Sequence, residues 1–532
     1  MIRVSRKLTD QVVIVETLAA RVAAALDRLH WLILVLLVAA WLAATAGAAR
    51  MKPFWHDEIF TILLARLPST RAIWAALGDG SDLSAPLNTL VTHGVYAVVG
   101  VGHVSTRLPP LAGTALMLAV LFAFVRLRAG AAMGAAAVVL VPYTAAYRYS
   151  YEARGYGLML GFFMLALFCW AEAAIGRRRV LYVPLMAIAL AGSYWSNYFG
   201  VFALAPIAVG ELVRAARRRR PDTAVWLAAI ASLLAIVPLL GFLRAAEAQS
   251  ARFWSRAAFS DIPVTYRFVL HELFNHRLVL ATLAAVAVYA IGYMTRAHVI
   301  RPEVRYRGLP AHEVAAIGTC LFLPVLEIAG AVATSGVFVP RYALPLVIGA
   351  VLAISLGISQ LVGRSRLAPI VFALVLTTSF GTDIYASLTR SSMAFVSPVD
   401  QSPVLTSALH EPKPVVVTGG LMFLQLWYYT EPAVRGRLWY LADPGEAYKY
   451  TGADTIDRGL IALARWAPLN VAEYDRFSST HPEFHVYTAG SGWLLARLAD
   501  DRVPIEEVAS EPGGKLLVVR TPRSASAPPL GR

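Results

Sequence analysis

The sequence predicts a polytopic α-helical membrane protein of about eleven transmembrane helices, followed by a C-terminal soluble α/β domain. The 532-residue chain is 58% hydrophobic and only 15% charged, which is far from the composition of a soluble globular protein. Apolar runs close to the length of about twenty residues that crosses a bilayer recur along most of the chain. After residue 387 this pattern changes to short apolar strands that alternate with helical segments.

The first segment, residues 1–29, combines basic residues such as Arg21 and Arg28 with apolar residues at helical spacing from Val12 onward. This pattern predicts an interfacial helix on the cytoplasmic surface of the membrane. The transmembrane domain that follows is predicted to span residues 30–387. Its spans are expected at residues 30–49, 109–125, 131–148, 157–175, 180–195, 198–213, 224–243, 277–294, 312–333, 342–362 and 367–386.

The short loops on one side of the predicted bundle are all basic. They contain Arg126 and Arg128, Arg177–Arg179, Arg214 and Arg217–Arg220, Arg296, Arg301, Arg305 and Arg307, and Arg364 and Arg366. Since cytoplasmic loops carry excess Lys and Arg, these loops and the N-terminus are expected in the cytoplasm. Residues 50–108, about 244–276 and everything after 387 then lie outside it. The net charge of +15 is explained in this way, and we expect no nucleic-acid partner.

Residues 388–520 are predicted to form the extracytoplasmic α/β domain, and residues 521–532 a disordered tail. Apolar, β-branched and aromatic residues predict strands at Pro414–Gly420, Arg437–Ala442, Glu483–Thr488 and Lys515–Arg520. Helices are expected between them at Phe423–Thr430, Thr455–Trp466 and Gly492–Asp500. The order of these elements predicts a small α/β fold.

Two adjacent carboxylates, Asp57 and Glu58, open the first outside segment directly after the first span, close to Lys52. Acidic groups at a membrane surface are costly unless they are solvated, paired or used. Ordinary solvation, with both acids capping the helix that follows, is the simpler interpretation of this pair taken alone. The alternative is a functional site at the outer membrane surface.

Two further charged clusters are predicted on the same side of the membrane. Tyr147–Tyr156 contains Glu152 and Arg154 among several tyrosines, which exceeds what an aromatic interfacial belt requires. Arg341 begins a later span on the outer side, where the positive-inside rule disfavours an Arg. The same face of the membrane therefore carries all three clusters.

The order of these motifs resembles that of the GT-C glycosyltransferases, in the family of protein O-mannosyltransferases, lipid A aminoarabinose transferases and rhizobial lipopolysaccharide galacturonosyltransferases. The resemblance covers about residues 30–385 and rests on Asp57-Glu58, Arg107-Leu108-Pro109, Glu152–Tyr156 and Arg341–Pro345. The chain departs from the family at Asp82-Leu83-Ser84-Ala85-Pro86-Leu87, where relatives often have Asp-x-x-Pro-Pro-Leu. A role for Asp82 is therefore not carried over.

The resemblance implies an inverting transferase, which moves a hexosyl or pentosyl group from a polyprenyl-phosphate donor to an envelope glycan, lipid or protein. The Ala- and Arg-rich composition is associated with GC-rich bacteria, so the expected location is a bacterial inner membrane. It implies that Asp57, with Glu58 beside it, acts as the general base. Arg154, Arg341 and Lys52 would bind the donor phosphate. Glu152 would be a second acid that, with Glu58, orients these cations or holds a divalent metal ion. Metal dependence stays open, and no other cofactor is expected.

A non-enzymatic polytopic protein, either a lipid or glycan transporter or a scaffold, is the alternative. A transporter should place polar residues in the middle of the membrane and show inverted repeats with broken helices. The charged clusters of this chain are instead superficial and lie on one side, which favours catalysis at the membrane surface.

The charge of the loops leads to a prediction about topology. Reporter fusions after Arg390 should be active only outside the cytoplasm, because the loop before the last span is basic. Fusions after Arg178 or Arg219 should report the cytoplasm. A cytoplasmic signal from the C-terminal fusion would reverse the topology and place Asp57 on the wrong side for the implied donor.

Overall fold

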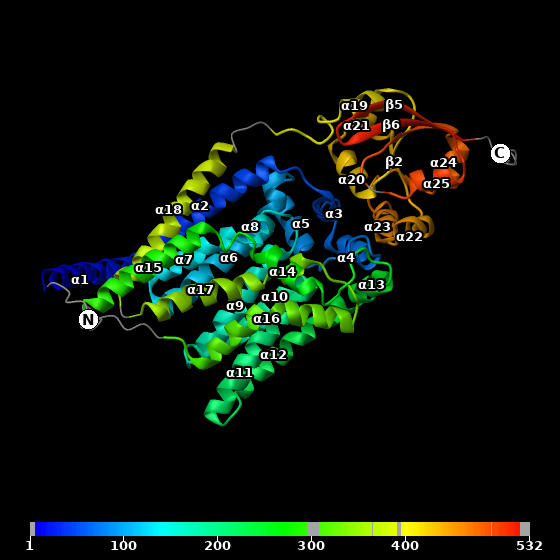
Figure 1. Cartoon of the computed structure of the whole chain (residues 1–532). Coiled ribbons are helices and arrows are strands. Elements are labelled where there is room, and N and C mark those ends of the chain that lie inside the picture. Colours follow the sequence, from blue (N-terminus) through cyan, green and yellow to red (C-terminus); the bar gives the residue numbers. More distant parts are fainter. Residues whose placement is uncertain (1–5, 296–307, 364, 391–394, 491, 522–532) are drawn as a thin grey trace.

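The computed structural model describes residues 6–295, 308–363, 365–390, 395–490 and 492–521. A bundle of helices forms the larger part, and an α/β domain sits at one end of it (Figure 1). We call the end of the bundle next to this domain the domain-bearing face. The turn between α11 and α12, which carries Arg217–Arg220, lies at the opposite end (Figure 1).

The bundle contains eighteen α-helices and several short 3₁₀ segments in the described part of the chain. The α-helices are α1 (Arg6–Arg28), α2 (His30–Met51), α3 (His56–Ala65), α4 (Thr70–Gly78), α5 (Leu87–Val99), α6 (His103–Ala129), α7 (Ala131–Leu140), α8 (Ala145–Ser150), α9 (Tyr156–Ala174), α10 (Arg179–Ser196), α11 (Leu204–Arg218), α12 (Thr223–Leu233), α13 (Leu240–Ser250), α14 (Asp261–Leu270), α15 (His276–Met294), α16 (Ala311–Ala333), α17 (Leu346–Leu361) and α18 (Leu367–Arg390). The 3₁₀ segments are η1 (Val141–Tyr143), η2 (Tyr198–Ala203), η3 (Leu234–Leu239) and η5 (Pro340–Ala343).

Nine helical segments of the described residues are long and apolar enough to cross a membrane. The other two predicted spans correspond to α7 and α10. The first ends after Leu140 because Pro142 follows, and the chain turns through η1 into the short α8. Helix α10 is full-length but contains Pro184 and begins at Arg179. The chain is thus a multi-pass helical membrane protein, and these two spans are a broken helix and a less apolar one.

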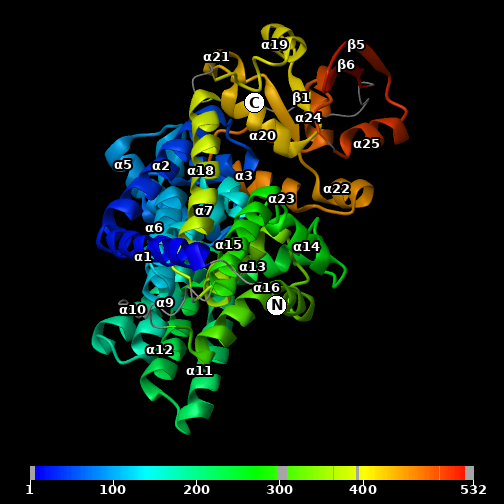
Figure 2. The same ribbon diagram turned by 60° about the vertical axis from the view of Figure 1, so that its left-hand side comes forward.

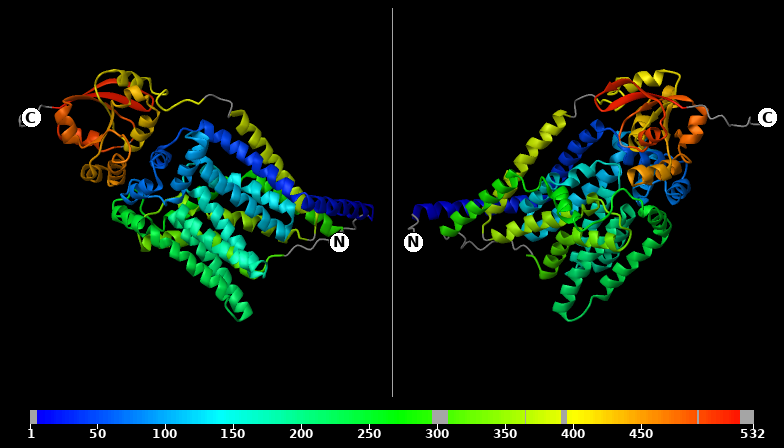
Figure 3. Two further views of the ribbon diagram at one scale, coloured as in Figure 1. Left: turned by 180° about the vertical axis from the view of Figure 1, so that it is seen from behind. Right: turned by 45° about the vertical axis from the view of Figure 1, so that its right-hand side comes forward.

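Large apolar side chains on the outside of the bundle fit a lipid environment. Val35 of α2, Leu280 of α15 and Leu374 of α18 are each more than half exposed. A soluble monomer rarely leaves many such residues uncovered. These helices lie along one edge of the bundle in Figure 1, and this edge faces the viewer in Figure 2; Figure 3 shows the bundle from two further sides. Helix α9, by contrast, is almost wholly buried.

The C-terminal domain is built on a six-stranded sheet in the order β3-β2-β1-β4-β6-β5. Strands β3, β2, β1 and β4 run parallel, and β6 and β5 are antiparallel to their neighbours. The elements are α19 (Pro403–His410), β1 (Val415–Val417), α20 (Gly420–Tyr429), α21 (Pro432–Arg435), β2 (Leu438–Leu441), α22 (Pro444–Thr451), α23 (Thr455–Leu463), β3 (Val471–Ala472), α24 (Tyr474–Thr480), β4 (Glu483–Tyr487), α25 (Leu494–Asp500), β5 (Ile505–Glu511) and β6 (Gly514–Arg520).

Alternation along the strands gives the sheet two apolar faces. Val415 and Val417 of β1 pack in the cluster that includes Phe423 of α20 and Leu460 of α23. Val416 points to the opposite side and belongs to a second cluster, with residues of α24 and α25. Successive residues of a strand alternate between faces, so three consecutive valines serve both. The domain is therefore a three-layer α/β unit.

The domain is docked on the bundle through polar contacts between side chains and loops. The Tyr429 hydroxyl accepts a hydrogen bond from the Phe54 backbone N–H at 2.7 Å. Gln425, also on α20, donates to the Phe54 carbonyl at 2.9 Å. Farther along the interface, Arg252 pairs with Asp454 at 3.2 Å. The loop between α2 and α3 is thus in direct contact with the C-terminal domain.

The strands and helices that the sequence predicts in this domain are all present, with boundaries shifted by a few residues. Two strands were missed. Strand β3 contains only two residues, Val471–Ala472, and β5 is an exposed edge strand with the polar sequence Ile505–Glu511. Neither has a period-two apolar pattern. The expected tail after Thr521, residues 1–5 of the first segment, and Arg296, Arg301, Arg305, Arg307 and Arg364 of the basic loops lie outside the described residues.

Candidate active site

Three segments that are far apart in the sequence meet on the domain-bearing face. The connection from α2 to α3 brings Lys52 and Asp57, the α8–α9 loop brings Glu152 and Arg154, and η5 brings Arg341. The loop between α4 and α5 adds Asp82 next to Arg154. We define the acid–cation cluster as Lys52, Asp57, Asp82, Glu152, Arg154 and Arg341.

Asp57 and Glu58 both lie in the first turn of α3, where the free N–H groups and the helix dipole favour carboxylates. Consecutive residues of an α-helix point about 100° apart, so the two acids face different surroundings. The Asp57 side chain is 20% exposed and faces Arg341, whereas that of Glu58 is completely buried. The adjacent acids therefore lie in different surroundings.

Glu58 forms a buried ion pair with Arg107 of α6. The Arg107 Nε and Nη2 atoms donate to the two carboxylate oxygens at 2.7 Å each, a bidentate arrangement. The Trp55 N–H also donates to Glu58 Oε2, and the Ala153 N–H donates to Oε1 at 2.8 Å. With both oxygens occupied, Glu58 is not placed to act on a substrate. We propose that Glu58 positions the segments around it, and the catalytic role that the resemblance implied stays a prediction.

Arg107 lies in the Arg-Leu-Pro motif, to which the sequence analysis gave no role. Besides Glu58, its guanidinium donates to the backbone carbonyls of Ala49 and Lys52. An Arg buried within a long apolar helix is costly unless it is paired, and this cost was the signal that could have identified it. Arg107 and Glu58 together hold the end of α2, the start of α3 and the loop before Arg154.

Asp57 is held ionised by its neighbours. Its Oδ2 atom lies 3.3 Å from Arg341 Nη2, and its Oδ1 atom lies 3.6 Å from His56 Nε2. Burial alone would raise the pKa of Asp57, but the guanidinium groups of Arg154 and Arg341 outweigh burial and hold the pKa below its usual value. Burial, reinforced by the same arginines, lowers the pKa of His56. At neutral pH Asp57 is therefore a carboxylate beside a neutral imidazole.

Arg341 retains unused donor capacity. Its Nε atom donates to the Tyr156 hydroxyl at 2.8 Å, and its Nη2 atom contacts Asp57. Its guanidinium also lies 5.6 Å from the centre of the Trp55 ring. No hydrogen bond of the Nη1 group is found among the described residues. An arriving anion can therefore bind Arg341 without displacing its existing partners.

Arg154 is more fully engaged, and its partner is Asp82. Its Nη1 and Nη2 atoms donate to the two Asp82 oxygens at 2.7 and 3.3 Å, and Nη2 also reaches the Ser84 hydroxyl. Nη1 further donates to the Asp57 carbonyl at 3.0 Å. The resemblance gave Asp82 no role, because the motif that begins at Asp82 departs from the family pattern. In the structure it orients Arg154.

Lys52 and Glu152 form the third pair. The Lys52 ammonium donates to Glu152 Oε1 at 2.8 Å and lies 5.6 Å from the centre of the Tyr151 ring. Burial raises the pKa of Glu152, although the charge of Lys52 opposes this effect. The second oxygen, Oε2, is buried and has no hydrogen-bond partner within the described structure.

The acids of the cluster do not converge on one point that would suit a metal ion. Glu58 is saturated by Arg107 and backbone N–H groups, and Glu152 faces Lys52. Across the described ranges, no group of three or more His, Cys, Asp and Glu residues has the arrangement of a metal site. Glu58 and Glu152 thus do not fit the paired-ligand role considered from the sequence.

The Glu58–Arg107 pair leads to a prediction about stability. Arg107→Met should destabilise the protein by about 3–5 kcal/mol, because it leaves a buried carboxylate without its partner. Thermal unfolding of the purified protein in detergent measures the loss. The double variant Arg107→Met/Glu58→Gln should recover part of it, since no unpaired charge remains.

Arg148→Met is the matched control for this experiment. Arg148 also approaches an acid of this region, Glu152, but at 3.6 Å and with a side chain that is 71% exposed. Such surface pairs contribute little, so the melting temperature should hardly change. A single variant Arg107→Met that melts like the wild type would contradict the proposed positioning role of this pair.

Comparison with known proteins places this arrangement on a known fold. No protein-family model and no curated protein matches the sequence. Among solved structures, ArnT from Cupriavidus metallidurans bound to undecaprenyl phosphate superposes with a TM-score of 0.54 and 14% identity, over 94% of this chain and 100% of that one. The apo state of the same protein gives a TM-score of 0.47 and 16% identity, over 93% and 99%. At such identities the likeness to the first structure establishes architecture. The chain therefore has the fold of ArnT from Cupriavidus metallidurans.

Proposed function

We propose that this protein is an inverting glycosyltransferase that moves a sugar from a polyprenyl-phosphate donor to an envelope glycan, lipid or protein. The observation that carries the proposal is the Asp57 carboxylate, held ionised beside Arg341 on the domain-bearing face. The undecaprenyl phosphate bound to ArnT supports a polyprenyl phosphate as the lipid carrier. The proposed location is a bacterial inner membrane, with the N-terminus in the cytoplasm and the C-terminal domain outside it.

The position of the acid–cation cluster suits a lipid-linked donor. A polyprenyl tail stays in the bilayer, so its phosphate and sugar are presented at the membrane surface. Lys52 follows α2 directly, and Arg341 lies in η5 at the start of the segment that continues into α17, so both cations lie at the ends of membrane-spanning segments. The cluster is therefore placed at the level where a donor phosphate emerges.

In the proposed reaction an acceptor hydroxyl oxygen attacks the anomeric carbon of the donor sugar. The new C–O bond forms as the bond between that carbon and the phosphate oxygen breaks, which inverts the configuration. Asp57 accepts the hydroxyl proton, and polyprenyl phosphate leaves with the bonding electrons. Because Asp57 is ionised at neutral pH, it is ready to accept this proton.

Negative charge grows on the phosphate as it leaves, so cations that face it stabilise the transition state. Arg341 is the first candidate, since one of its nitrogens is free and it already contacts Asp57. Lys52 is partly exposed and offers a point charge. Arg154, engaged by Asp82 and Ser84, contributes its charge and fixes the backbone of Asp57. No step is assigned to a metal ion.

The alternative of a transporter or scaffold is less well supported. The ions of the acid–cation cluster are gathered at one face and come from loops and helix ends. A transporter is expected to bind its substrate near the middle of the membrane between repeated halves. A charged site at one surface instead suits group transfer from a membrane-anchored donor.

The role of Asp57 leads to a test of catalysis. Asp57→Asn keeps the shape of the side chain but cannot take a proton, so the transfer rate should fall about 10²- to 10⁴-fold. The assay uses purified protein, a polyprenyl-phosphate sugar and a set of envelope acceptors. The melting temperature should change little, because Asp57 is partly exposed.

Asp79→Asn provides the control, since it makes the same substitution on the same side of the bundle. Asp79 accepts a hydrogen bond from Trp466 Nε1 at 3.2 Å, and Asn can still accept it. The transfer activity of the Asp79→Asn variant should match that of the wild type. A well-folded Asp57→Asn variant with normal turnover would remove the base from this mechanism and favour the transporter or scaffold.

The depressed pKa of Asp57 leads to a test of pH dependence. A carboxylate with a lowered pKa loses its proton-accepting form only as the pH falls through that low value. Arg341→Gln removes one of the charges that lower it, so the pKa of Asp57 should rise and the acidic limb of kcat/KM should move to higher pH. The KM for the donor should also increase, because Arg341 is proposed to bind phosphate. An unshifted acidic limb would contradict the coupling of Arg341 to Asp57.

A further inference from the structure

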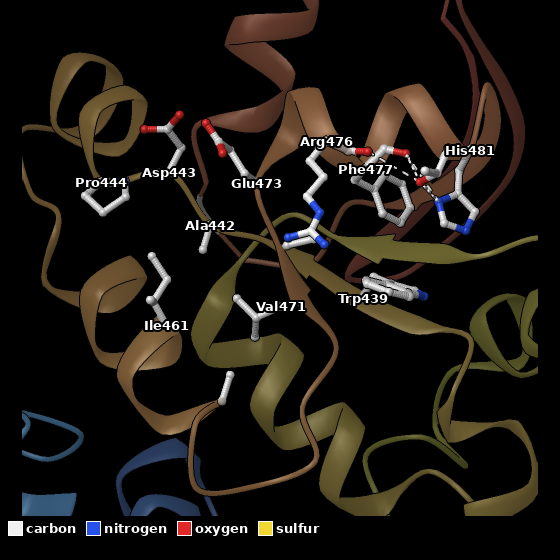
Figure 4. Close-up of a pocket in the computed structure, with 13 residues that line it drawn as sticks. Trp439, Ala442, Asp443, Pro444, Ile461, Val471, Glu473, Arg476, Phe477 and His481 are labelled. Carbon is white, nitrogen blue, oxygen red and sulfur yellow. Dashed lines mark hydrogen bonds between the residues drawn. The ribbon is translucent and has the colours of Figure 1, made fainter. Parts of the chain in front are cut away.

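A cavity of about 700 Å³ lies in the C-terminal domain (Figure 4), and none of its lining residues belongs to the acid–cation cluster. Ala442 and Asp443, which follow β2, and Glu473, which follows β3, contribute to its lining. One end of the cavity therefore lies at the carboxyl ends of two parallel strands, where α/β domains commonly bind ligands. Its volume is within the range of small-molecule sites.

One side of the cavity is aromatic. Trp439, Phe477 and His481 line it, with Phe477 and His481 stacked at 4.5 Å and Trp439 5.2 Å from Phe477. Trp439 is only half-buried although it lies on β2, an inner strand of the sheet. A partly exposed indole at the wall of a cavity offers an apolar face together with an N–H donor.

The other side of the cavity carries charged groups with free hydrogen-bonding capacity. Asp443 uses its Oδ1 atom to cap α22, while no hydrogen bond to Oδ2 is found in the described structure. The side chains of Glu473 and Arg476 form no hydrogen bond or ion pair within the described ranges. Figure 4 shows the two carboxylates on one side and Arg476 extending from α24 between them and the aromatic wall.

We propose that this cavity binds an uncharged hexopyranose ring of a glycan. The aromatic wall would cover one apolar face of the ring. The hydroxyl groups would donate to Asp443 and Glu473 and accept from Arg476, which matches the donors and acceptors that are free. A nucleotide or other anion fits less well, because Asp443 and Glu473 together outweigh the charge of Arg476.

The position of the bound ring relative to Asp57 indicates that the ring is part of the acceptor. Helix α23 lines the cavity with Ile461, and on another side its Gly459 approaches Phe60 of α3, the helix that carries Asp57. About one helix diameter therefore separates the cavity from α3. The role as an acceptor subsite rests on the proposed transferase function, whereas the binding of a pyranose does not.

Binding is tested on the full-length protein in detergent with methyl pyranosides of glucose, galactose and mannose. Saturation-transfer NMR and calorimetry should give a Kd on the order of 1 mM for at least one of them, as expected for a ligand of this size. The methyl glycoside of glucuronic acid should bind more weakly than its glucose counterpart, because the carboxylates repel it. Failure of all three neutral pyranosides at ten times the expected Kd, or tighter binding of the uronide, would overturn the proposal.

Substitutions of residues that line the cavity test whether the sugar binds there. Arg476→Gln should weaken it about five- to tenfold through the loss of charged hydrogen bonds, and Trp439→Ala should weaken it further. Trp439→Ala also removes packing, so the melting temperature of this variant is measured. Glu473→Gln changes an exposed side chain and serves as a second variant of the cavity lining. Arg465→Gln, exposed on the same domain and outside the cavity lining, should bind as the wild type does. Equal binding by Arg476→Gln, Glu473→Gln and wild type would place the sugar elsewhere.

Asp57→Asn separates this inference from the proposed function. It should lower the transfer rate about 10²- to 10⁴-fold but leave pyranoside binding unchanged. If transfer persists in that variant while Arg476→Gln still weakens binding, the transferase mechanism fails and the cavity remains a sugar site. If transfer is lost in Asp57→Asn but no pyranoside binds, only the cavity proposal fails.

Discussion

The buried ion pair between Glu58 and Arg107 is the interaction on which the candidate active site depends. A carboxylate taken out of water is tolerated only when its charge and lone pairs are satisfied. Here Arg107 and backbone N–H groups from two segments satisfy Glu58. One of these N–H groups belongs to Ala153, directly before Arg154. The pair thus sets the separation between the helix that carries Asp57 and the loop that carries Arg154.

The acid–cation cluster places each cation beside its own acid. Lys52 pairs with Glu152, Arg154 with Asp82, and Arg341 with Asp57, so the cluster is close to neutral before a donor arrives. A phosphate must then compete for the cations, and the outcome depends on how fully each is engaged. Arg154 makes the most bonds, whereas one nitrogen of Arg341 has no hydrogen bond to any described residue. This difference is the reason that Arg341 is the first candidate for binding the phosphate.

Much of the architecture could be predicted from the sequence, because hydropathy and loop charge are local properties. The sequence also indicated that Asp57, Arg154 and Arg341 lie on the same side of the membrane, because their motifs fall in segments on that side. The different surroundings of Asp57 and Glu58 could not be predicted, since the sequence alone does not show which side of α3 is buried. Asp82 was set aside because it fits no family pattern. Its pairing with Arg154 depends on a contact between residues 72 positions apart.

The contacts of Phe54 connect the active site to the C-terminal domain. Its backbone N–H and carbonyl bond to Tyr429 and Gln425 of the domain, and its ring lies 4.6 Å from the Arg107 guanidinium. The same short loop is therefore held by the bundle on one side and by the domain on the other. It leads directly into α3, so a displacement of the domain would act on the backbone next to Asp57. In the proposed reaction, a glycan held by the domain would then be positioned relative to the base through this loop.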